Sequence, residues 1–313
     1  MKRKELAVVV SVLTLAFLGI GIGMLRGANF GIAAPQGIIA TEQRNLIVIA
    51  LLLMLVVVVP VYVLVVLFAW RYRASNTKAK YTPDWHSNST IETIWWTLPL
   101  IIIVILAAIT YRTSHTLDPY RPLAAGKPPV EVQVVALQWK WLFIYPQYNI
   151  ATVNYLAFPE DTPLNLTITS DAPMNSFWIP QLGGQVYAMS GMQTQLHLLA
   201  DNPGSYPGSS ANISGEGFAD MRFEARAVST QEFSGWIAAV RSGTTVLGTD
   251  QYEQLVKPAA ATEPINFAYA DPMLFATIIN KYMHPVHDSD HSNSESTEGT
   301  DGHDSKHQTG RHY

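Results

Sequence analysis

The feature that most constrains this chain is an apolar run without a single charge, NLIVIALLLMLVVVVPVYVLVVLFAW at residues 45–70. A helix needs about 20 mostly apolar residues to cross a bilayer, so this run predicts a transmembrane helix. Pro60 lies near its middle and removes one backbone hydrogen bond, which a membrane helix tolerates when a neighbouring group satisfies the freed carbonyl. We expect a kink there.

A second run, TIWWTLPLIIIVILAAITY at residues 93–111, is just long enough to span a membrane. Its aromatic residues lie near its two ends, where interfacial aromatic belts form: Trp95, Trp96 and Tyr111. Residues 36–120 are therefore expected to form a transmembrane hairpin. The loop at 71–92 carries four basic residues against two acidic ones, so the positive-inside rule predicts that it is cytoplasmic. Everything after the second helix is then outside.

Residues 1–35 hold a third apolar stretch, LAVVVSVLTLAFLGIGIGML, preceded by Lys2, Arg3 and Lys4. This stretch must also cross the membrane if the basic residues stay inside and the hairpin begins outside. A positive start is typical of an export signal, whereas the long apolar region and the lack of a clean cleavage site before Pro35 favour a permanent helix. The sequence leaves both alternatives open.

From about residue 128 the pattern changes to short β-type runs separated by turn signals. Four runs predict strands: VEVQVVALQWKWLFIY, PLNLTITS, TQLHLLA and MRFEARAV. Residues 121–229 therefore predict a small β-sandwich or barrel, and no fixed-period repeat indicates a propeller or solenoid. The Pro and Gly residues at 202–208 predict a turn before a polar loop, SSANISGEGFADM at 209–221. Residues 230–283 predict an extension that begins with a helix over roughly 230–254.

The remaining residues, 284–313, are rich in Ser, His and Asp and cannot bury a core, so they predict a disordered tail. Six of the nine histidines lie in it: His284, His287, His291, His303, His307 and His312. Such a tract can bind metal adventitiously, and the sequence leaves open whether it does. In the β-domain only His197 remains, and a lone histidine on a strand is more often structural than a ligand.

Two features of the composition exclude whole classes of function. The formal net charge of −4 argues against a nucleic-acid partner. The chain has no cysteine, which excludes disulfides, thiolate catalysis and lipidation on Cys.

Four stretches carry a resemblance to a known family: IETIWWTLP, QWKWLFIYP, APMNSFWIPQLGGQVYAMSGM and SGEGFADM. Together they resemble subunit II of the haem-copper respiratory oxidases, and more specifically the quinol-oxidising, cytochrome bo type. The resemblance covers residues 36–283. It implies a membrane α plus β fold, in which the hairpin is followed by a cupredoxin-like sandwich or barrel and a short helical C-terminal extension.

In relatives that oxidise cytochrome c, the β-domain holds a two-copper centre, copper A. The resemblance places its ligands at Asn175, Ser210, Ser214, Phe218 and Met221, of which only the methionine matches. Two bridging thiolates and the imidazoles make such a site bind copper, and neither hydroxyl, amide nor phenyl groups replace them. We therefore expect this chain to bind no metal and no other cofactor.

The resemblance also implies how the complex works. Without copper A the chain has no relay for cytochrome c, so the electron donor is a membrane quinol, ubiquinol. The complex is expected to oxidise quinol, reduce oxygen to water and pump protons, with two haems and one copper ion in subunit I. Expected partners are subunits I, III and IV and membrane lipid, in a bacterial inner membrane that this chain crosses more than once with its C-terminal domain in the periplasm.

Glu92, at the cytoplasmic start of the second predicted helix, is a candidate for chemistry. In the family, a Glu just before the W-T-x-P turn lies at the mouth of the proton channel through subunit I, and acids at membrane depth are functional candidates. An acid at a helix N-terminus is also favoured by the helix dipole without any further role.

Aromatic residues of the β-domain and of the extension could serve either packing or a contact with a partner. In copper-bearing relatives the cluster at Trp139 and Trp141 lies near the electron route, but without copper we expect these residues to pack. Four aromatic residues of the extension are expected to form a docking surface: Phe267, Tyr269, Phe275 and Tyr282.

Two other functions remain to be weighed. A cytochrome c oxidase subunit is contradicted by the lack of cysteine. A free-standing, membrane-anchored copper carrier would predict clusters of Met and His inside the domain, and these are missing.

Overall fold

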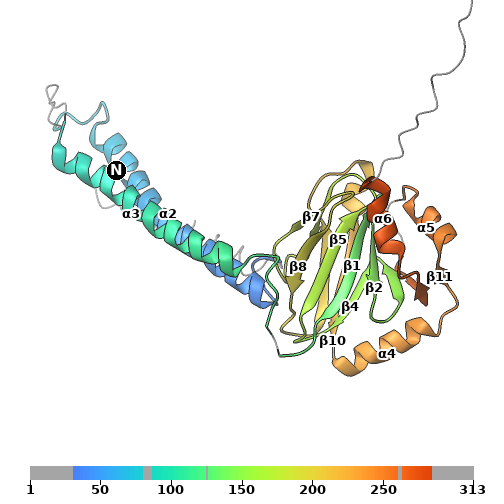
Figure 1. Cartoon of the computed structure of the whole chain (residues 1–313). Helices are drawn as coiled ribbons and strands as arrows, with labels where there is room; N and C mark the ends of the chain where they lie inside the picture. Colours follow the sequence, from blue (N-terminus) through green and yellow to red (C-terminus); the bar gives the residue numbers. More distant parts are fainter. Residues whose placement is uncertain (1–30, 80–86, 125, 260–262, 284–313) are drawn as a thin grey trace, which may run out of the picture.

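The structure is a computed structural model that describes residues 31–79, 87–124, 126–259 and 263–283. The predicted signal or anchor segment at 1–35 therefore lies almost wholly outside the described residues, as does part of the loop at 71–92. The predicted tail at 284–313 lies entirely outside them. The rest forms a long helical hairpin joined to a β-sandwich (Figure 1).

Two helices form the hairpin, α2 (Ile38–Arg71) and α3 (Ser89–Thr116). They lie side by side and project away from the sandwich (Figure 1). Both are long and apolar enough to cross a membrane, and both extend beyond the apolar runs at 45–70 and 93–111. Most of their apolar side chains are exposed. A helix that is hydrophobic all round needs lipid or a partner protein to cover it, so these two helices are expected to lie in a membrane. α2 continues as one helix through Pro60.

The sandwich has two sheets. The first contains β1 (Val130–Leu137), β2 (Lys140–Tyr145), β3 (Ile150–Val153), β5 (Leu164–Ser170), β8 (Thr194–Leu198) and β12 (Ile265–Phe267), in the order β12-β3-β2-β1-β5-β8. The second contains β4 (Tyr155–Pro159), β6 (Asn175–Trp178), β7 (Val186–Ala188), β9 (Gly204–Ser210) and β10 (Arg222–Val228), in the order β4-β10-β9-β6-β7. Strands β1 and β5 pair in parallel, as do β4 and β10, and the other pairs are antiparallel. All four predicted runs form strands.

The core between the sheets is built on an aromatic cluster. Trp141 and Phe143 on β2 face Phe177 on β6 and Phe223 on β10, and the ring centroids lie 5.0–6.2 Å apart. Such edge-to-face and offset pairs add to the gain from burial alone. Trp141 is fully buried, which confirms that it packs.

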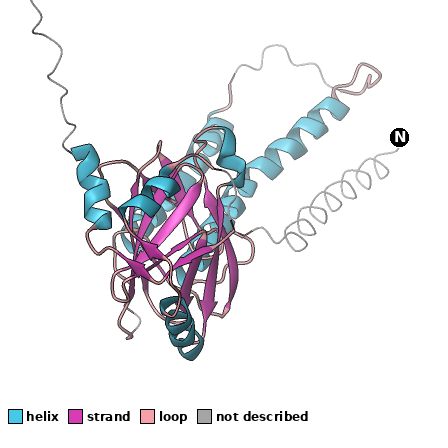
Figure 2. Cartoon of the chain, turned by 90° about the vertical axis from the view of Figure 1, so that its right-hand side faces the viewer, coloured by secondary structure: helices cyan, strands magenta, loops and turns pink. Residues whose placement is uncertain are grey.

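A second core covers the outer face of the first sheet. Three helices, α4 (Thr230–Arg241), α5 (Thr249–Val256) and α6 (Leu274–Met283), follow the sandwich, with a small ribbon of β11 (Val246–Leu247) and β13 (Tyr269–Ala270). Figure 2 shows these helices against the strands, with the hairpin projecting away. Apolar residues of α5 and α6 pack on β1, β2 and β3. Buried on both faces, β2 therefore has no exposed residue in its six.

The extension corrects two expectations. The single helix expected over roughly 230–254 is two helices, because the chain turns after Arg241 to form β11. The expected docking surface is also wrong in part, since Phe267 and Phe275 are 3% and 4% exposed and belong to the second core. Only Tyr269 and Tyr282 are exposed, at 46% and 40%.

The turn expected at 202–208 is mostly strand β9. Pro207 is accommodated because β9 pairs with β6 only at Ser209 and Ser210, leaving Pro207 beyond that ladder. Gly208 is required by packing, since a Cβ there would lie 2.0 Å from the Phe223 ring. The Phe223 ring on strand β10 fills the space that a side chain at position 208 would need. The strand propensity of the local sequence does not reveal such a contact.

Candidate functional site

Three of the five copper A positions lie together at one end of the second sheet. Asn175 begins β6, Ser210 ends β9, and Met221 follows the short 3-10 helix η1 (Glu216–Asp220). The Ser210 Oγ donates to Asn175 Oδ1 at 3.0 Å, and the Ser210 backbone N–H donates to Met221 O at 3.2 Å. The fold therefore brings these positions together although 46 residues separate the first from the last.

The other two positions lie in the intervening loop. The Ser214 hydroxyl is buried and, within the described part of the chain, has no hydrogen-bond partner. Phe218 lies in η1, half-buried, and its carbonyl accepts from the Met221 backbone N–H at 3.1 Å. All five positions thus belong to one region formed by β6, β9 and the loop between β9 and β10.

The side chains at these positions do not fit a copper centre. They offer an amide, two hydroxyls, a phenyl ring and one thioether, whereas soft copper sites need thiolate and imidazole ligands. Met221 is fully buried and packs in the sandwich core. Among the residues that the structure describes, no group of three or more His, Cys, Asp or Glu side chains could hold a metal ion. Hydrogen bonds and the burial of Met221 therefore account for the structure of this region without a metal ion.

Trp139, in the turn between β1 and β2, contacts this loop. Its indole N–H donates to Ser214 O at 3.4 Å, and a Cβ at Gly217 would lie 2.3 Å from the Trp139 ring. Its backbone has φ 66°, in the left-handed region that bulky residues rarely occupy. The expectation that Trp139 packs is confirmed, and it contacts the loop that holds Ser214 and Phe218.

A buried acid beside this region escaped sequence analysis. The Asp171 side chain, at the end of β5, is 0% exposed. It accepts hydrogen bonds from the Tyr252 hydroxyl at 2.7 Å, Lys281 Nζ at 2.8 Å and the Tyr282 hydroxyl at 2.5 Å. The donors come from α5 and α6, so Asp171 links the extension to the sandwich by hydrogen bonds. Asp171 lies four residues before Asn175 in the sequence. No local signal reveals it, because its partners are 81–111 residues away.

This network shifts the pKa values of its donors. Burial, followed by the bond to Asp171, raises the pKa of Tyr252 and of Tyr282. The hydrogen bond to Asp171 raises the pKa of Lys281. All three donors therefore keep their protons at neutral pH, as the network requires.

Glu92 lies in the first turn of α3, where it helps to cap the helix. Asn88 Oδ1 accepts from the Ile91 backbone N–H at 3.1 Å, and Glu92 Oε1 accepts from the Asn88 backbone N–H at 3.3 Å. Such reciprocal bonds satisfy two free donors of a helix start. The Glu92 side chain is exposed. The geometry thus gives Glu92 a capping contact and also access to solvent.

His197 has a structural role, as its isolation on a strand predicts. It is 7% exposed, and its Nδ1 donates to Pro119 O at 2.8 Å. Pro119 lies just after α3, so this bond ties β8 to the chain leaving the hairpin.

Family models match three parts of the chain. The transmembrane domain of cytochrome c oxidase subunit II matches residues 28–113, its periplasmic domain matches 149–228, and the COX aromatic rich motif matches 241–286. Among solved structures, the periplasmic domain of cytochrome oxidase subunit II from Bradyrhizobium japonicum aligns at TM-score 0.35 and 19% identity, over 37% of this chain and 96% of that domain.

Curated relatives match most of the chain. The cytochrome bo(3) ubiquinol oxidase subunit 2 of Pseudomonas aeruginosa is 48% identical over 83% of this chain and 79% of its own length. The ubiquinol oxidase subunit 2 of Acetobacter aceti is 48% identical over 83% of this chain and 85% of its own length. The quinol oxidase subunit 2 of Bacillus cereus is 39% identical over 76% of this chain and 84% of its own length. With two apolar helices, a cupredoxin-like sandwich and no copper A ligand set, the chain belongs to the cytochrome bo(3) ubiquinol oxidase subunit 2 family, within subunit II of the haem-copper oxidases.

Proposed function

We propose that this chain is the non-metal subunit II of a terminal ubiquinol oxidase, a complex that oxidises ubiquinol, reduces oxygen to water and pumps protons. The observation that carries the proposal is the set of side chains at the copper A positions, Asn, Ser, Ser and Phe, in a chain otherwise close to quinol oxidase subunits. A subunit without these ligands cannot accept single electrons from cytochrome c. The catalytic metals, two haems and one copper ion, then reside in subunit I, beside subunits III and IV.

The purified complex provides the test. We expect one copper per two haems, rapid oxidation of ubiquinol and no oxidation of reduced cytochrome c. Three coppers per complex, or turnover with cytochrome c alone, would contradict the proposal.

Restoring the copper A ligand types by substitution tests whether their absence is what prevents copper binding. Asn175→His, Ser210→Cys, Ser214→Cys and Phe218→His, added together, restore the ligand types beside Met221. Asn175, Ser210 and Met221 are already in contact, so we expect a mixed-valence two-copper signal after Cu(II) is added. The parent chain serves as the control and should give no such signal. The domain used must extend to Met283, since β12 and α6 are part of the fold.

We also propose that the chain crosses a bacterial inner membrane more than once, with the sandwich in the periplasm. The two apolar helices and the basic residues between them support this topology. A reporter fused near Asn76 should score cytoplasmic, and one fused after Met283 should score periplasmic. The opposite pattern would overturn the topology.

We further propose that Glu92 takes up protons for oxygen reduction. Its exposed carboxylate at the cytoplasmic end of α3 can exchange protons with water and hand them to a buried chain in subunit I. Glu92→Gln removes the titratable group but keeps an oxygen that can accept from the Asn88 N–H. We expect oxidase turnover to fall several-fold, with normal assembly and haem spectra and partial recovery in Glu92→Asp.

Asn88→Ala is the matched control for that variant. It removes the Asn88 side-chain cap, which costs about 1 kcal/mol, and leaves the carboxylate in place. Turnover should stay near the parental rate. If Asn88→Ala slows the enzyme as much as Glu92→Gln, or if Glu92→Gln turns over at the parental rate, Glu92 is a structural cap only.

A further inference from the structure

Two hollows adjoin where the hairpin meets the sandwich. The smaller, of about 120 Å³, is lined by the start of α2, the segment after α3 and β8. The larger, of about 490 Å³, lies along α2 beside the end of β6 and falls in the size range of small-molecule sites. Gln43, Gly184 and Gln185 line both, so the two hollows are neighbours that share one wall.

The two hollows differ in chemistry. The smaller is also largely apolar, but charged and polar groups, among them Thr116, Asp118, Arg121 and His197, line part of it, and it is called the polar compartment below. The larger is mainly apolar and is lined by Ile32, Leu46, Ile47, Trp178 and Pro180. A polar compartment beside an apolar groove matches an amphiphilic ligand.

The site lies at the expected edge of the bilayer. The uncharged run of α2 begins at Asn45, so Leu46 and Ile47 mark the start of its hydrocarbon-facing part. Asp118 and Arg121 come just after α3 ends, beyond the membrane-spanning part. The groove therefore reaches the acyl region at Leu46 and Ile47, and the polar compartment lies at the expected level of the lipid headgroups.

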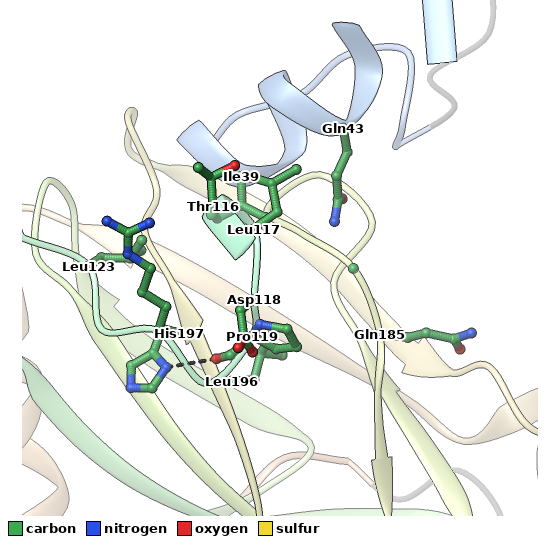
Figure 3. Close-up of a pocket in the computed structure, with 12 residues that line it drawn as sticks. Ile39, Gln43, Thr116, Leu117, Asp118, Pro119, Leu123, Gln185, Leu196 and His197 are labelled. Carbon is green, nitrogen blue, oxygen red and sulfur yellow. Dashed lines mark hydrogen bonds between the residues drawn. The ribbon is translucent and has the colours of Figure 1, made fainter. Parts of the chain in front are cut away.

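The walls of this site are held in place by hydrogen bonds between hairpin and sandwich. The Ala40 N–H donates to Leu182 O at 3.2 Å, and the Gln36 N–H donates to Gln181 O at 2.8 Å. Figure 3 shows the bond from His197 to Pro119, with Gln43 reaching down from α2 on the other side. A Cβ at Gly37 would lie 2.3 Å from Leu199 O, so the start of α2 sits directly on the sandwich. The hollow is thus built into the fold.

The polar compartment holds one exposed acid and one exposed base. The Arg121 guanidinium has no ion pair or side-chain hydrogen bond to any residue in the described ranges. Asp118 uses one oxygen to accept from the Tyr120 N–H at 2.9 Å. The two residues also share a turn, since the Arg121 N–H donates to Asp118 O at 3.0 Å. One free cation and one anion at the same opening are complementary to a zwitterion.

The geometry points to a binding site for one molecule of a zwitterionic aminophospholipid, phosphatidylethanolamine. Arg121 binds the phosphate, Asp118 binds the ammonium group, and an acyl chain lies along Leu46, Ile47 and Trp178. Arginine is suited to the phosphate because its planar fork can donate two parallel hydrogen bonds. The site goes beyond the proposed oxidase activity and requires only that the hairpin spans a membrane.

The charges favour this ligand over two other occupants. A quinol has no anionic group for Arg121 and no cation for Asp118. Phosphatidylglycerol would satisfy Arg121 through its phosphate but offers Asp118 a neutral glycerol in place of a cation. A side chain of a partner subunit could also fill the groove, and the experiment below separates that case.

The test measures lipid retention in the purified complex. The complex is reconstituted in nanodiscs with equal parts of phosphatidylethanolamine and phosphatidylglycerol, extracted with mild detergent and weighed by native mass spectrometry. We expect one retained phosphatidylethanolamine that is lost in Arg121→Gln, with an affinity about tenfold lower or worse. Asp118→Asn should remove the preference for phosphatidylethanolamine over phosphatidylglycerol.

Arg112→Gln is the matched control, since Arg112 is an exposed cation of α3 that does not line the site. It should retain the lipid as the parent does. Free phosphoethanolamine, tested up to millimolar concentration, should not displace the lipid, because it lacks the acyl chain. The proposal is overturned if Arg121→Gln keeps the lipid, if Arg112→Gln loses it equally, if phosphatidylglycerol is retained instead, or if the parent complex retains no lipid.

Discussion

The hairpin and the sandwich use the same kinds of apolar residue in opposite ways. In the spanning windows of α2 and α3 none of the residues is buried by the chain itself, whereas every residue of β2 is buried. Trp96 on α3 is 77% exposed, and Trp141 on β2 is fully buried. The hairpin thus depends on lipid and on partner subunits, while the sandwich satisfies its own apolar surface.

The largest effect should come from opening the sandwich core. Phe177 is fully buried and contacts three aromatic rings, so Phe177→Ala leaves a cavity and should lower the free energy of unfolding by about 3–5 kcal/mol. Urea denaturation of the fragment 121–283, followed by tryptophan fluorescence, measures this loss.

Leu52→Ala is the corresponding change in the hairpin. Leu52 is 59% exposed, so in the full chain in detergent the unfolding of the sandwich should change by less than about 0.5 kcal/mol. A loss comparable to that of Phe177→Ala would mean that the sandwich depends on the hairpin, and would break the comparison.

An intermediate effect is expected where the extension is fastened. Asp171→Ala leaves the hydroxyls of Tyr252 and Tyr282 without their acceptor, so it should lower the stability of the fragment by about 2–3 kcal/mol. Lys281→Met should lower it by less than about 1 kcal/mol, because the Lys281 side chain is 54% exposed and its ion pair is screened by solvent. Equal losses in the two variants would show that the ion pair, and not the buried carboxylate, holds α6.

The smallest effect should appear at high pH. The pKa values of Lys281, Tyr252 and Tyr282 are all raised in the folded state, so the folded state holds these protons more tightly than the unfolded chain does. Their contribution is complete below the ordinary values of 10.0 for tyrosine and 10.5 for lysine, and it is lost as the pH rises above them.

Denaturation of the fragment at pH 8 and pH 11 should therefore show lower stability at pH 11. Asp171→Ala should lose less over the same interval, because its donors no longer have their acceptor. An identical slope in parent and variant would place the alkaline sensitivity elsewhere.

Sequence patterns anticipated the strands with strong alternation but not those held by packing. The four predicted runs became strands, because apolar residues at every second position mark a half-buried face. The Pro and Gly content of strand β9 indicates a turn, but pairing with β10 and β6 holds it as a strand, and the Phe223 ring explains why residue 208 is glycine. Likewise, the sequence suggested that Phe267 and Phe275 are docking residues, but the fold buries Phe267 of β12 and Phe275 of α6 in the second core.

The sequence by itself determined the two apolar helices, the lack of thiolate ligands and the family, because these depend on composition and on residues in a fixed order. The tertiary structure alone decided which distant groups meet. It brought Asn175 to Ser210, Asp171 to three donors of the extension, and Asp118 and Arg121 to a hollow that residues of α2 and β8 also line. The physical reason is that these contacts join residues far apart in the chain, and local periodicity carries no information about such pairs.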